Sequence, residues 1–401
     1  MNSVTSRDWW FVSSPIAAGQ FCDRLAPMNR MFSRIRLALF AVYAICIAIA
    51  ATVVWAGPPA GLLDQTHASV KAVMALQSAV TPDLMKLPDV LGSAVGLDDA
   101  GQPALVVFVN RDGASRADVV RALPPALRGI AVRAELTDAF RAFAGKPGGG
   151  GGVSHRAGQE LPIQLGTSGG WSYDLANGYC CGGTLGSLIQ VNGVQFILSN
   201  YHVLESDIVG GGNNLVASTG NPVIQPGLID VGCNANNAQA VGTLVKINSL
   251  PNSNVDASIA QVTEGMVRSD GAILEIGLLS SQTVAASLNQ GVKKSGRTTG
   301  LTRSKVTGLN ATIRVTYENE CAGTTAFTKT FTGQIVISNS GSKFLNSGDS
   351  GSLLVEDVST RPRAAGLLYA GSSTSAIANP IGEVLQYIGA TLGGTATMVG
   401  N

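Results

Sequence analysis

The sequence predicts an all-β body, a barrel or a sandwich, over residues 157–401, preceded by a small α+β domain over residues 57–144. Glycine is abundant, at 49 of 401 residues, and only 13% of the residues are charged, which suits a fold with many turns. From residue 157 onward, short apolar runs alternate with turns rich in Gly, Asn, Ser and Thr, a pattern typical of barrels and sandwiches. One helix, over Gly382–Leu392, is expected near the end of the chain.

The first 56 residues predict a signal peptide or a membrane anchor. An uncharged apolar run over residues 37–55 follows three arginines and leads into Val-Trp-Ala, which offers small residues where a signal peptidase reads. The run approaches the length of a membrane span, so an uncleaved anchor is the alternative. We favour cleavage and export to the periplasm or the cell exterior. Translation is expected to begin at Met28 or Met31, because residues 1–27 do not resemble an ordinary signal start.

The region 57–144 has the alternating pattern of an α+β domain. The predicted elements are helices over Ala68–Leu76 and Arg116–Leu123 and strands over Pro103–Val109 and Ile130–Leu136. No set of residues in this domain suggests chemistry.

A Gly-rich linker over residues 145–156 ties the α+β domain to the β-rich body. Tethering gives a domain a high effective concentration at its neighbour, so even a weak contact would be populated. We therefore expect residues 57–146 to act as a pro-region in intramolecular contact with the body, cleaved in or near Gly148–Gly152. A permanent module that recruits substrates or partners is the alternative.

Charge and cysteine usage narrow the function classes. The chain has a formal net charge of +1, and residues 147–401 carry thirteen basic and fifteen acidic residues, so no nucleic-acid partner is expected. The cysteines that follow the predicted leader are Cys180, Cys181, Cys233 and Cys321. They predict one or two disulfides in an oxidising compartment, and the sequence leaves their pairing open. Adjacent cysteines rarely bond to each other. No zinc site and no cofactor are expected.

The segment Asn346–Val355 carries the strongest chemical signal. It places Ser350 between glycines in a tight turn that leads into an apolar strand. A serine hydroxyl needs a base to become a nucleophile, and donors to hold the oxyanion that it creates. The flanking glycines would let the N–H groups of Gly348 and Ser350 point at one place, so the segment predicts a hydrolase that works through an acyl-enzyme.

Three histidines could supply the base: His67, His155 and His202. His202 alone lies well inside the body that carries Ser350, next to the apolar strand Val194–Leu198. His155 ends a polyglycine run, where we do not expect rigid positioning. His202 is therefore the predicted base.

The imidazole needs a carboxylate to orient it. The aspartates between His202 and Ser350 are Asp207, Asp230, Asp256 and Asp270. Asp207 follows the histidine too closely, and Asp270 lies in a solvated turn. Asp256 opens the strand-like Ala257–Val262 and is our candidate; Asp230, at a possible strand end, is the alternative.

The order His202, Asp256, Ser350 is that of chymotrypsin-type enzymes, and not of subtilisins or α/β-hydrolases. The surrounding motifs, Ser-Asn-Tyr-His-Val, Val-Asp-Ala-Ser-Ile-Ala and Gly-Asp-Ser-Gly-Ser, resemble those of trypsin-like serine peptidases, and most closely the bacterial type. The resemblance covers about 240 residues, from near Leu161 to the C-terminus. It implies a double β-barrel in which the first barrel carries the histidine and aspartate and the second the serine.

The resemblance also implies where substrate binds. Gly366–Gly371 stands where the family places its substrate-pairing strand, so Tyr369, Ala370 and Gly371 are expected to contact a peptide. Phe344 matches the floor of the specificity pocket, and without an aspartate there a trypsin-like preference for Lys or Arg loses its support. Gly296–Thr302 resembles a motif of a bacterial and plant subgroup and is interpreted as a structural hairpin.

Two features depart from the digestive enzymes of that family. No cysteine follows His202, and no segment could supply a new N-terminus to pair with Asp349, which we expect to bond nearby backbone groups instead.

One motif competes with the Ser350 segment: Gly166–Gly170 matches the G-x-S-x-G nucleophile elbow around Ser168. It lacks the strand, the helix and the spacing that the elbow requires, and we attribute it to glycine-rich composition.

Together these features predict an exported serine endopeptidase acting on polypeptide substrates. The alternatives are a non-catalytic peptide-binding protein on a peptidase scaffold and an esterase.

Overall fold

The structure is a computed structural model of the whole chain, and it describes residues 63–143, 154–176, 179–205, 217–318 and 327–401. The predictions for the apolar run 37–55, for Asp207 and for Cys321 lie outside the described residues. Among the described helices, none is both long and apolar enough to cross a membrane.

The first barrel is built from one antiparallel sheet of eight strands. Its strands are β6 (Thr167–Trp171), β9 (Gly183–Leu185), β10 (Ser187–Val191), β11 (Val194–Ser199), β12 (Pro222–Gln225), β13 (Gln239–Val245), β14 (Ser258–Val262) and β21 (Ala396–Met398). They pair in the order β21-β10-β11-β14-β13-β12-β6-β9. Only Gly186 separates β9 from β10, so the sheet closes through this bend. A Cβ on Gly186 would lie 1.9 Å from the carbonyl oxygen of Gly351, so the bend needs a glycine where it meets the turn around Ser350.

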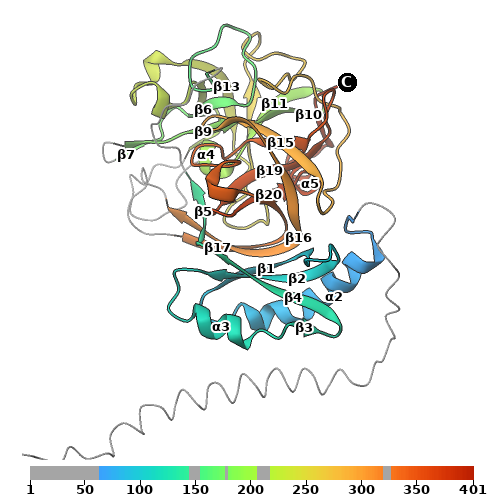
Figure 1. Cartoon of the computed structure of the whole chain (residues 1–401). Helices are drawn as coiled ribbons and strands as arrows, with labels where there is room; N and C mark the ends of the chain where they lie inside the picture. Colours follow the sequence, from blue (N-terminus) through green and yellow to red (C-terminus); the bar gives the residue numbers. More distant parts are fainter. Residues whose placement is uncertain (1–62, 144–153, 177–178, 206–216, 319–326) are drawn as a thin grey trace, which may run out of the picture. The chain divides into compact units, whose positions relative to one another are not determined.

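The second barrel closes by strand pairing. Its strands are β15 (Gly291–Gly296), β16 (Gly300–Glu318), β17 (Phe327–Ser338), β18 (Leu353–Glu356), β19 (Ala364–Gly371) and β20 (Ser375–Pro380). They pair in the order β15-β18-β19-β20-β17-β16, and β16 pairs back to β15. The chain thus has the trypsin-like double-barrel fold that the sequence predicted, with both barrels visible in the upper part of Figure 1.

Short elements connect the strands. They are β7 (Leu175–Ala176), β8 (Tyr179–Cys180), α4 (Tyr201–Leu204), η2 (Leu228–Asp230), η3 (Ala235–Asn237), η4 (Ser340–Ser342) and α5 (Ile381–Leu392). The predicted closing helix is confirmed as α5, which ends at Gly393 in the left-handed conformation and is followed by β21. Asp230 ends a 3-10 helix, so the prediction of a strand end there was wrong.

The N-terminal layer comprises α2 (Ala68–Leu84), β1 (Val90–Leu97), β2 (Pro103–Asn110), α3 (Arg116–Ala122), β3 (Ala126–Leu127) and β4 (Ile130–Thr137). All four predicted elements occur, although α2 is longer than expected and β1 was not predicted. β1 pairs antiparallel with β16, so the sheet of this layer continues into the long β16–β17 hairpin of the second barrel (Figure 1).

A last strand, β5 (Phe140–Phe143), leaves this layer and joins the barrel. It runs parallel to the end of β16 and pairs antiparallel with β19 where Arg141 faces Gly371. β5 therefore lies at the end of the strand that the sequence analysis assigned to substrate.

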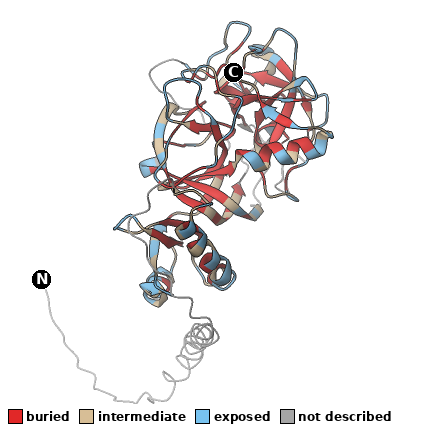
Figure 2. Ribbon diagram, turned by 90° about the vertical axis from the view of Figure 1, so that its right-hand side faces the viewer, coloured by how far each residue is buried: buried red, intermediate tan, exposed pale blue. Residues whose placement is uncertain are grey.

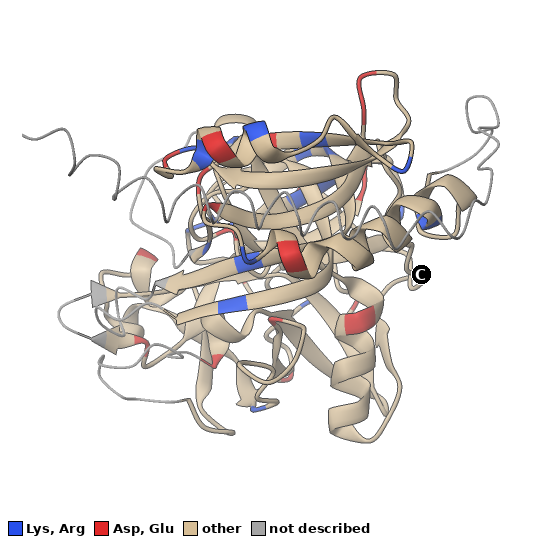
Figure 3. Ribbon diagram, turned by 90° about the horizontal axis from the view of Figure 1, so that it is seen from below, with Lys and Arg blue, Asp and Glu red and all other residues tan. Residues whose placement is uncertain are grey.

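Buried side chains form three clusters. Figure 2 marks buried residues in red along the ribbon, in the barrels and in the N-terminal layer. One fills the first barrel, and a second joins the second barrel to α2 and β1. The third contains Phe140 of β5 together with Tyr201, Tyr317 and Tyr369. Charged residues of both signs are interspersed, with no field of one sign in Figure 3.

Candidate active site

The first barrel brings His202 and Asp256 together. β11 pairs antiparallel with β14, with Ser199 opposite Ser258, so the residues that follow one strand meet those that precede the other. His202 lies in the single turn α4, and its Nδ1 is 2.7 Å from Oδ2 of Asp256. The aspartate is fully buried. A donor at Nδ1 leaves Nε2 as the acceptor position of the neutral imidazole.

Asp256 is held by several donors besides the histidine. The Tyr201 N–H donates to Oδ1 at 2.7 Å, and the Tyr317 hydroxyl donates to Oδ2 at 2.9 Å. The Asn200 side chain donates to its carbonyl oxygen at 2.7 Å. These donors fix the position of the Asp256 side chain and of its backbone beside His202.

The turn that carries Ser350 is fixed from the first barrel. Gly348 and Gly351 have φ values of 93° and 92°, which favour glycine. Thr184 of β9 donates through its hydroxyl to the Gly348 carbonyl and through its N–H to the Ser350 carbonyl, both at 2.9 Å. A Cβ on Gly351 would lie 2.2 Å from the Thr184 carbonyl oxygen, so no other residue fits there.

Gly183 lies between the segment that carries His202 and the turn that carries Ser350. A Cβ on that glycine would lie 2.6 Å from the Val203 side chain and 3.0 Å from the Ser350 carbonyl oxygen. Nε2 of His202 is buried and has no hydrogen-bond partner among the described residues, and Oγ of Ser350 lies 3.4 Å from the Tyr369 carbonyl oxygen. Catalytic hydrogen bonds are often long or misaligned before substrate binds. A buried, unpartnered acceptor fits a group that takes a proton during a reaction.

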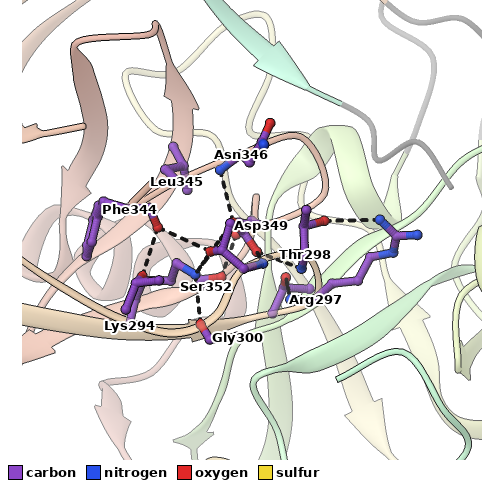
Figure 4. Close-up of polar contacts among 12 residues, drawn as sticks. Lys294, Arg297, Thr298, Gly300, Phe344, Leu345, Asn346, Asp349 and Ser352 are labelled. Atoms are coloured by element: carbon purple, nitrogen blue, oxygen red, sulfur yellow. Dashed lines mark hydrogen bonds and ion pairs between the residues drawn. The ribbon is translucent and has the colours of Figure 1, made fainter. Parts of the chain in front are cut away.

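Asp349 anchors the same turn to β15 and β16 (Figure 4). Its Oδ1 accepts from the N–H groups of Thr298 and Thr299, at 2.8 and 3.1 Å. Its Oδ2 accepts from the Thr299 hydroxyl at 2.7 Å and from the Asn346 N–H at 3.0 Å. Asp349 therefore bonds nearby backbone groups, as the sequence analysis expected.

A buried ammonium accompanies that carboxylate. Nζ of Lys294 lies 3.5 Å from Oδ2 of Asp349, and both side chains are fully buried. Nζ also donates to the Gly300 carbonyl at 2.9 Å. Burial lowers the pKa of Lys294, and the neighbouring carboxylate opposes that shift. The sequence analysis missed Lys294 because nothing in a Val-Lys-Lys-Ser strand says that one lysine pairs with a buried carboxylate.

The alternative orienter, Asp230, lies in a different contact. Its carboxylate receives two bonds from Arg297, at 2.6 Å each, and one from the Ser168 hydroxyl at 2.6 Å. Arg297 sits in the β15–β16 turn, which confirms the hairpin predicted over Gly296–Thr302. Ser168 is buried in β6, with neither the strand-to-helix turn nor the base of a nucleophile elbow.

The residues that were predicted to bind substrate lie partly in the core and partly at a strand edge. Phe344 is buried in the core cluster of the second barrel, and its carbonyl accepts from the Thr302 hydroxyl at 2.8 Å. Tyr369 is also buried, with its ring 4.9 Å from that of Phe331. Ala370 and Gly371 pair with β20 on one side, and β5 occupies the other side at Gly371.

The expectation for His155 was wrong. It is buried, with Nε2 2.6 Å from a Glu275 oxygen and Nδ1 2.9 Å from the Gly166 carbonyl oxygen. His155, near the end of the predicted linker, is thus packed on the barrels. The polyglycine before His155 hid this, because composition says nothing about contacts made more than 100 residues away.

One of the expected disulfides is present, between Cys180 and Cys233. Among the described residues, no group of three or more His, Cys, Asp or Glu side chains could hold a metal ion.

Comparisons with known proteins find remote likenesses only. No protein-family model matches the chain, and no curated protein matches it in sequence. Among solved structures, a glutamic acid-specific serine protease is 16% identical, with a TM-score of 0.37 over 59% of this chain and 100% of its own. Thermobifida fusca protease A is 17% identical, with a TM-score of 0.38 over 60% and 99%. Cellulomonas bogoriensis chymotrypsin is 19% identical, with a TM-score of 0.35 over 60% and 99%. At such TM-scores the likeness carries no argument about activity, and the fold assignment rests on the strand pairing.

Proposed function

We propose that the protein is a serine endopeptidase that acts on polypeptides. The observation that carries the proposal is the contact of His202 with the buried Asp256, which leaves Nε2 unpartnered, together with the packing of the next residue, Val203, and of the Ser350 turn against Gly183. In the proposed reaction, Nε2 takes the Ser350 proton as Oγ attacks the substrate carbonyl carbon. Asp256 stabilises the imidazolium, and the N–H groups of Gly348 and Ser350 hold the oxyanion. The imidazolium then protonates the leaving amine, and water releases the acyl group by the reverse sequence.

Labelling with a fluorophosphonate probe tests this mechanism. We expect one modified serine, mapped by mass spectrometry to Ser350, and no modification of Ser350→Ala. Modification at Ser168, or none in folded protein, would contradict the proposal and favour the non-catalytic binding protein. Cleavage of activated esters without cleavage of any peptide would favour the esterase.

We also propose that the specificity pocket prefers apolar or small side chains. Phe344 is uncharged and buried, and Tyr369 and Ala370 bring no charge to the adjoining strand. A charged substrate side chain would lose hydration there without a partner. Profiling with a peptide library checks this, and a profile led by Arg, Lys, Asp or Glu would overturn it.

Export is the third part of the proposal. The Cys180–Cys233 disulfide suits an oxidising compartment, and the leader over residues 1–56 supplies a route. Fractionation of cells and N-terminal sequencing of the protein check it. A start near residue 57 supports a cleaved signal peptide, whereas an intact N-terminus in the membrane fraction supports the anchor.

Finally, we propose that residues 57–146 act as a pro-region. Two contacts support this: the β1–β16 pairing, and the place of β5 beside Gly371, where a substrate strand would pair. The junction is also polar, since the Ser373 N–H and hydroxyl both donate to Asp138, at 3.0 and 2.5 Å. Substrate and β5 would compete for one strand edge.

The test compares the secreted protein with a chain that starts at Val153. The pro-region proposal expects the secreted form to lack residues 57–146, and the short chain to fold poorly unless those residues are supplied in trans. It fails if the mature protein keeps its N-terminal layer and the short chain is soluble with unchanged activity.

A further inference from the structure

The contact between Tyr317 and Asp256 joins the two barrels at the proposed active site. Tyr317 lies near the end of β16, in the second barrel, 61 residues along the chain from Asp256. Its hydroxyl donates at 2.9 Å to Oδ2, the same oxygen that faces Nδ1 of His202 at 2.7 Å. One carboxylate oxygen therefore serves both the histidine and a phenol, while Oδ1 is held by a backbone N–H.

The Tyr317 hydroxyl has a partner that the neighbouring buried tyrosine lacks. Tyr317 and Tyr369 are both buried in the same cluster, yet the Tyr369 hydroxyl has no hydrogen-bond partner among the described residues. Burial, with the nearby Asp256 carboxylate, raises the pKa of Tyr317 well above its ordinary value. The phenol therefore stays protonated at any working pH and acts towards Asp256 as a donor.

The ring of Tyr317 is fixed on several sides. It meets the His202 ring edge-on, with centroids 5.9 Å apart, and the rings of Phe327 and Phe331 lie 6.0 and 6.4 Å from it. Tyr317 is also opposite Ala142 in the β5–β16 pairing. A donor held this firmly restricts rotation of the carboxylate and packs against the imidazole that the carboxylate orients.

We propose that Tyr317 is a positioning residue of the triad, which fixes Oδ2 of Asp256 and, through it, the imidazole of His202. This inference rests on the proposed function. In this view, Tyr317 of β16 and Asp256 together orient the His202 ring.

The test uses the full chain and three variants. Tyr317→Phe removes only the hydroxyl, and Asp256→Asn provides the reference for loss of the orienter. Tyr387→Phe is the matched control, because its hydroxyl also donates within the protein, at 2.9 Å to the Ile247 carbonyl, but from helix α5. The measurements are the second-order rate of fluorophosphonate labelling, the low-field proton resonance of His202 Nδ1–H, and the melting temperature.

We expect Tyr317→Phe to slow labelling about tenfold, far less than the ~10⁴-fold loss known for an aspartate-to-asparagine change in such triads. Added to Asp256→Asn, it should slow labelling no further, because it acts through that carboxylate. The Nδ1–H resonance should move downfield, since Oδ2 loses its second donor. Tyr387→Phe should change neither readout, even if it lowers the melting temperature.

A labelling rate and a resonance that both stay at the wild-type values in Tyr317→Phe would overturn the inference, whatever the melting temperature. If that variant does not fold, 3-fluorotyrosine placed at position 317 gives the second variant. As a stronger donor of nearly the same size, it should move the resonance upfield, and an unmoved resonance would refute the inference. If the wild-type protein is not labelled at all, the proposed function fails, but the resonance still decides the role of Tyr317.

Discussion

Replacing Lys294 by methionine should destabilise the fold and loosen the Ser350 turn. The substitution keeps an unbranched side chain in the core but removes the ammonium 3.5 Å from Oδ2 of Asp349. It also removes the donor to the Gly300 carbonyl. Asp349 would remain a fully buried carboxylate without a neighbouring cation.

The expected loss in the free energy of unfolding depends on two opposing contributions, the attraction between the charges and the desolvation of the ammonium. At 3.5 Å, a pair of unit charges attracts by about 5 kcal/mol at an effective dielectric constant of about 20. Desolvation of the ammonium offsets part of this, and removal of one partner of a buried pair usually costs about 3–5 kcal/mol. Asp349 keeps four other hydrogen bonds, from two threonines and Asn346, so we expect the lower end, about 3 kcal/mol.

Urea unfolding in a Ser350→Ala background measures this free energy without self-cleavage. The matched control is Lys293→Met, which removes the neighbouring lysine of the same strand, whose Nζ donates to the Val358 carbonyl at 2.7 Å. A double-mutant cycle with Asp349→Asn isolates the pair, and we expect a coupling of about 2 kcal/mol. With Ser350 present, Lys294→Met should also slow fluorophosphonate labelling. A loss below about 1 kcal/mol, or one equal to that of Lys293→Met, would refute the reasoning.

Three further outcomes are expected. Asp256→Asn should leave the fold intact and lower kcat by about 10⁴-fold, whereas Asp230→Asn should mainly lower the melting temperature; the reverse result would reassign the orienter. Replacing Cys180 and Cys233 by serine should lower the free energy of unfolding, measured in urea, by up to about 4 kcal/mol, because the bond closes a loop with a sequence separation of 53. Burial raises the pKa of Asp138, but its hydrogen bonds from the β19–β20 hairpin outweigh this and leave the pKa below 3.8. The stability that Asp138 gives to the contact between the N-terminal layer and the second barrel is therefore complete above pH 3.8, and it is lost as the pH falls through the folded-state pKa. Hydrogen exchange in β5 should accelerate over that pH range, and it should accelerate less in Asp138→Asn.

The strands and turns of the barrels could be predicted because their signals are local. Glycines at positive φ mark the Ser350 turn, and the apolar run before His202 is β11. The motif after Gly296 marks a hairpin, which the β15–β16 pairing confirms. Each of these depends on neighbours within a few residues, so the sequence itself contains the information.

The polar contacts across the molecule could not be predicted in this way. Tyr317 reads as one more aromatic in an alternating strand, and Lys294 as one of two adjacent lysines. His155 follows five glycines, yet its partner Glu275 is 120 residues away. Such pairs depend on how two barrels dock, and strand periodicity gives only the face on which a side chain lies.

Two parts of the proposed active site, Asp256 and the Ser350 turn, are tied to the opposite barrel by a buried polar contact. Asp256 of the first barrel is bonded by Tyr317 of the second, and the Ser350 turn of the second is bonded by Thr184 of the first. The Arg297–Asp230 pair crosses the same boundary at 2.6 Å. Apolar packing would hold two barrels together in many orientations, whereas hydrogen bonds between buried groups are satisfied in few. The polar contacts therefore select one docking of the two barrels, and the geometry of the proposed site depends on the boundary between them.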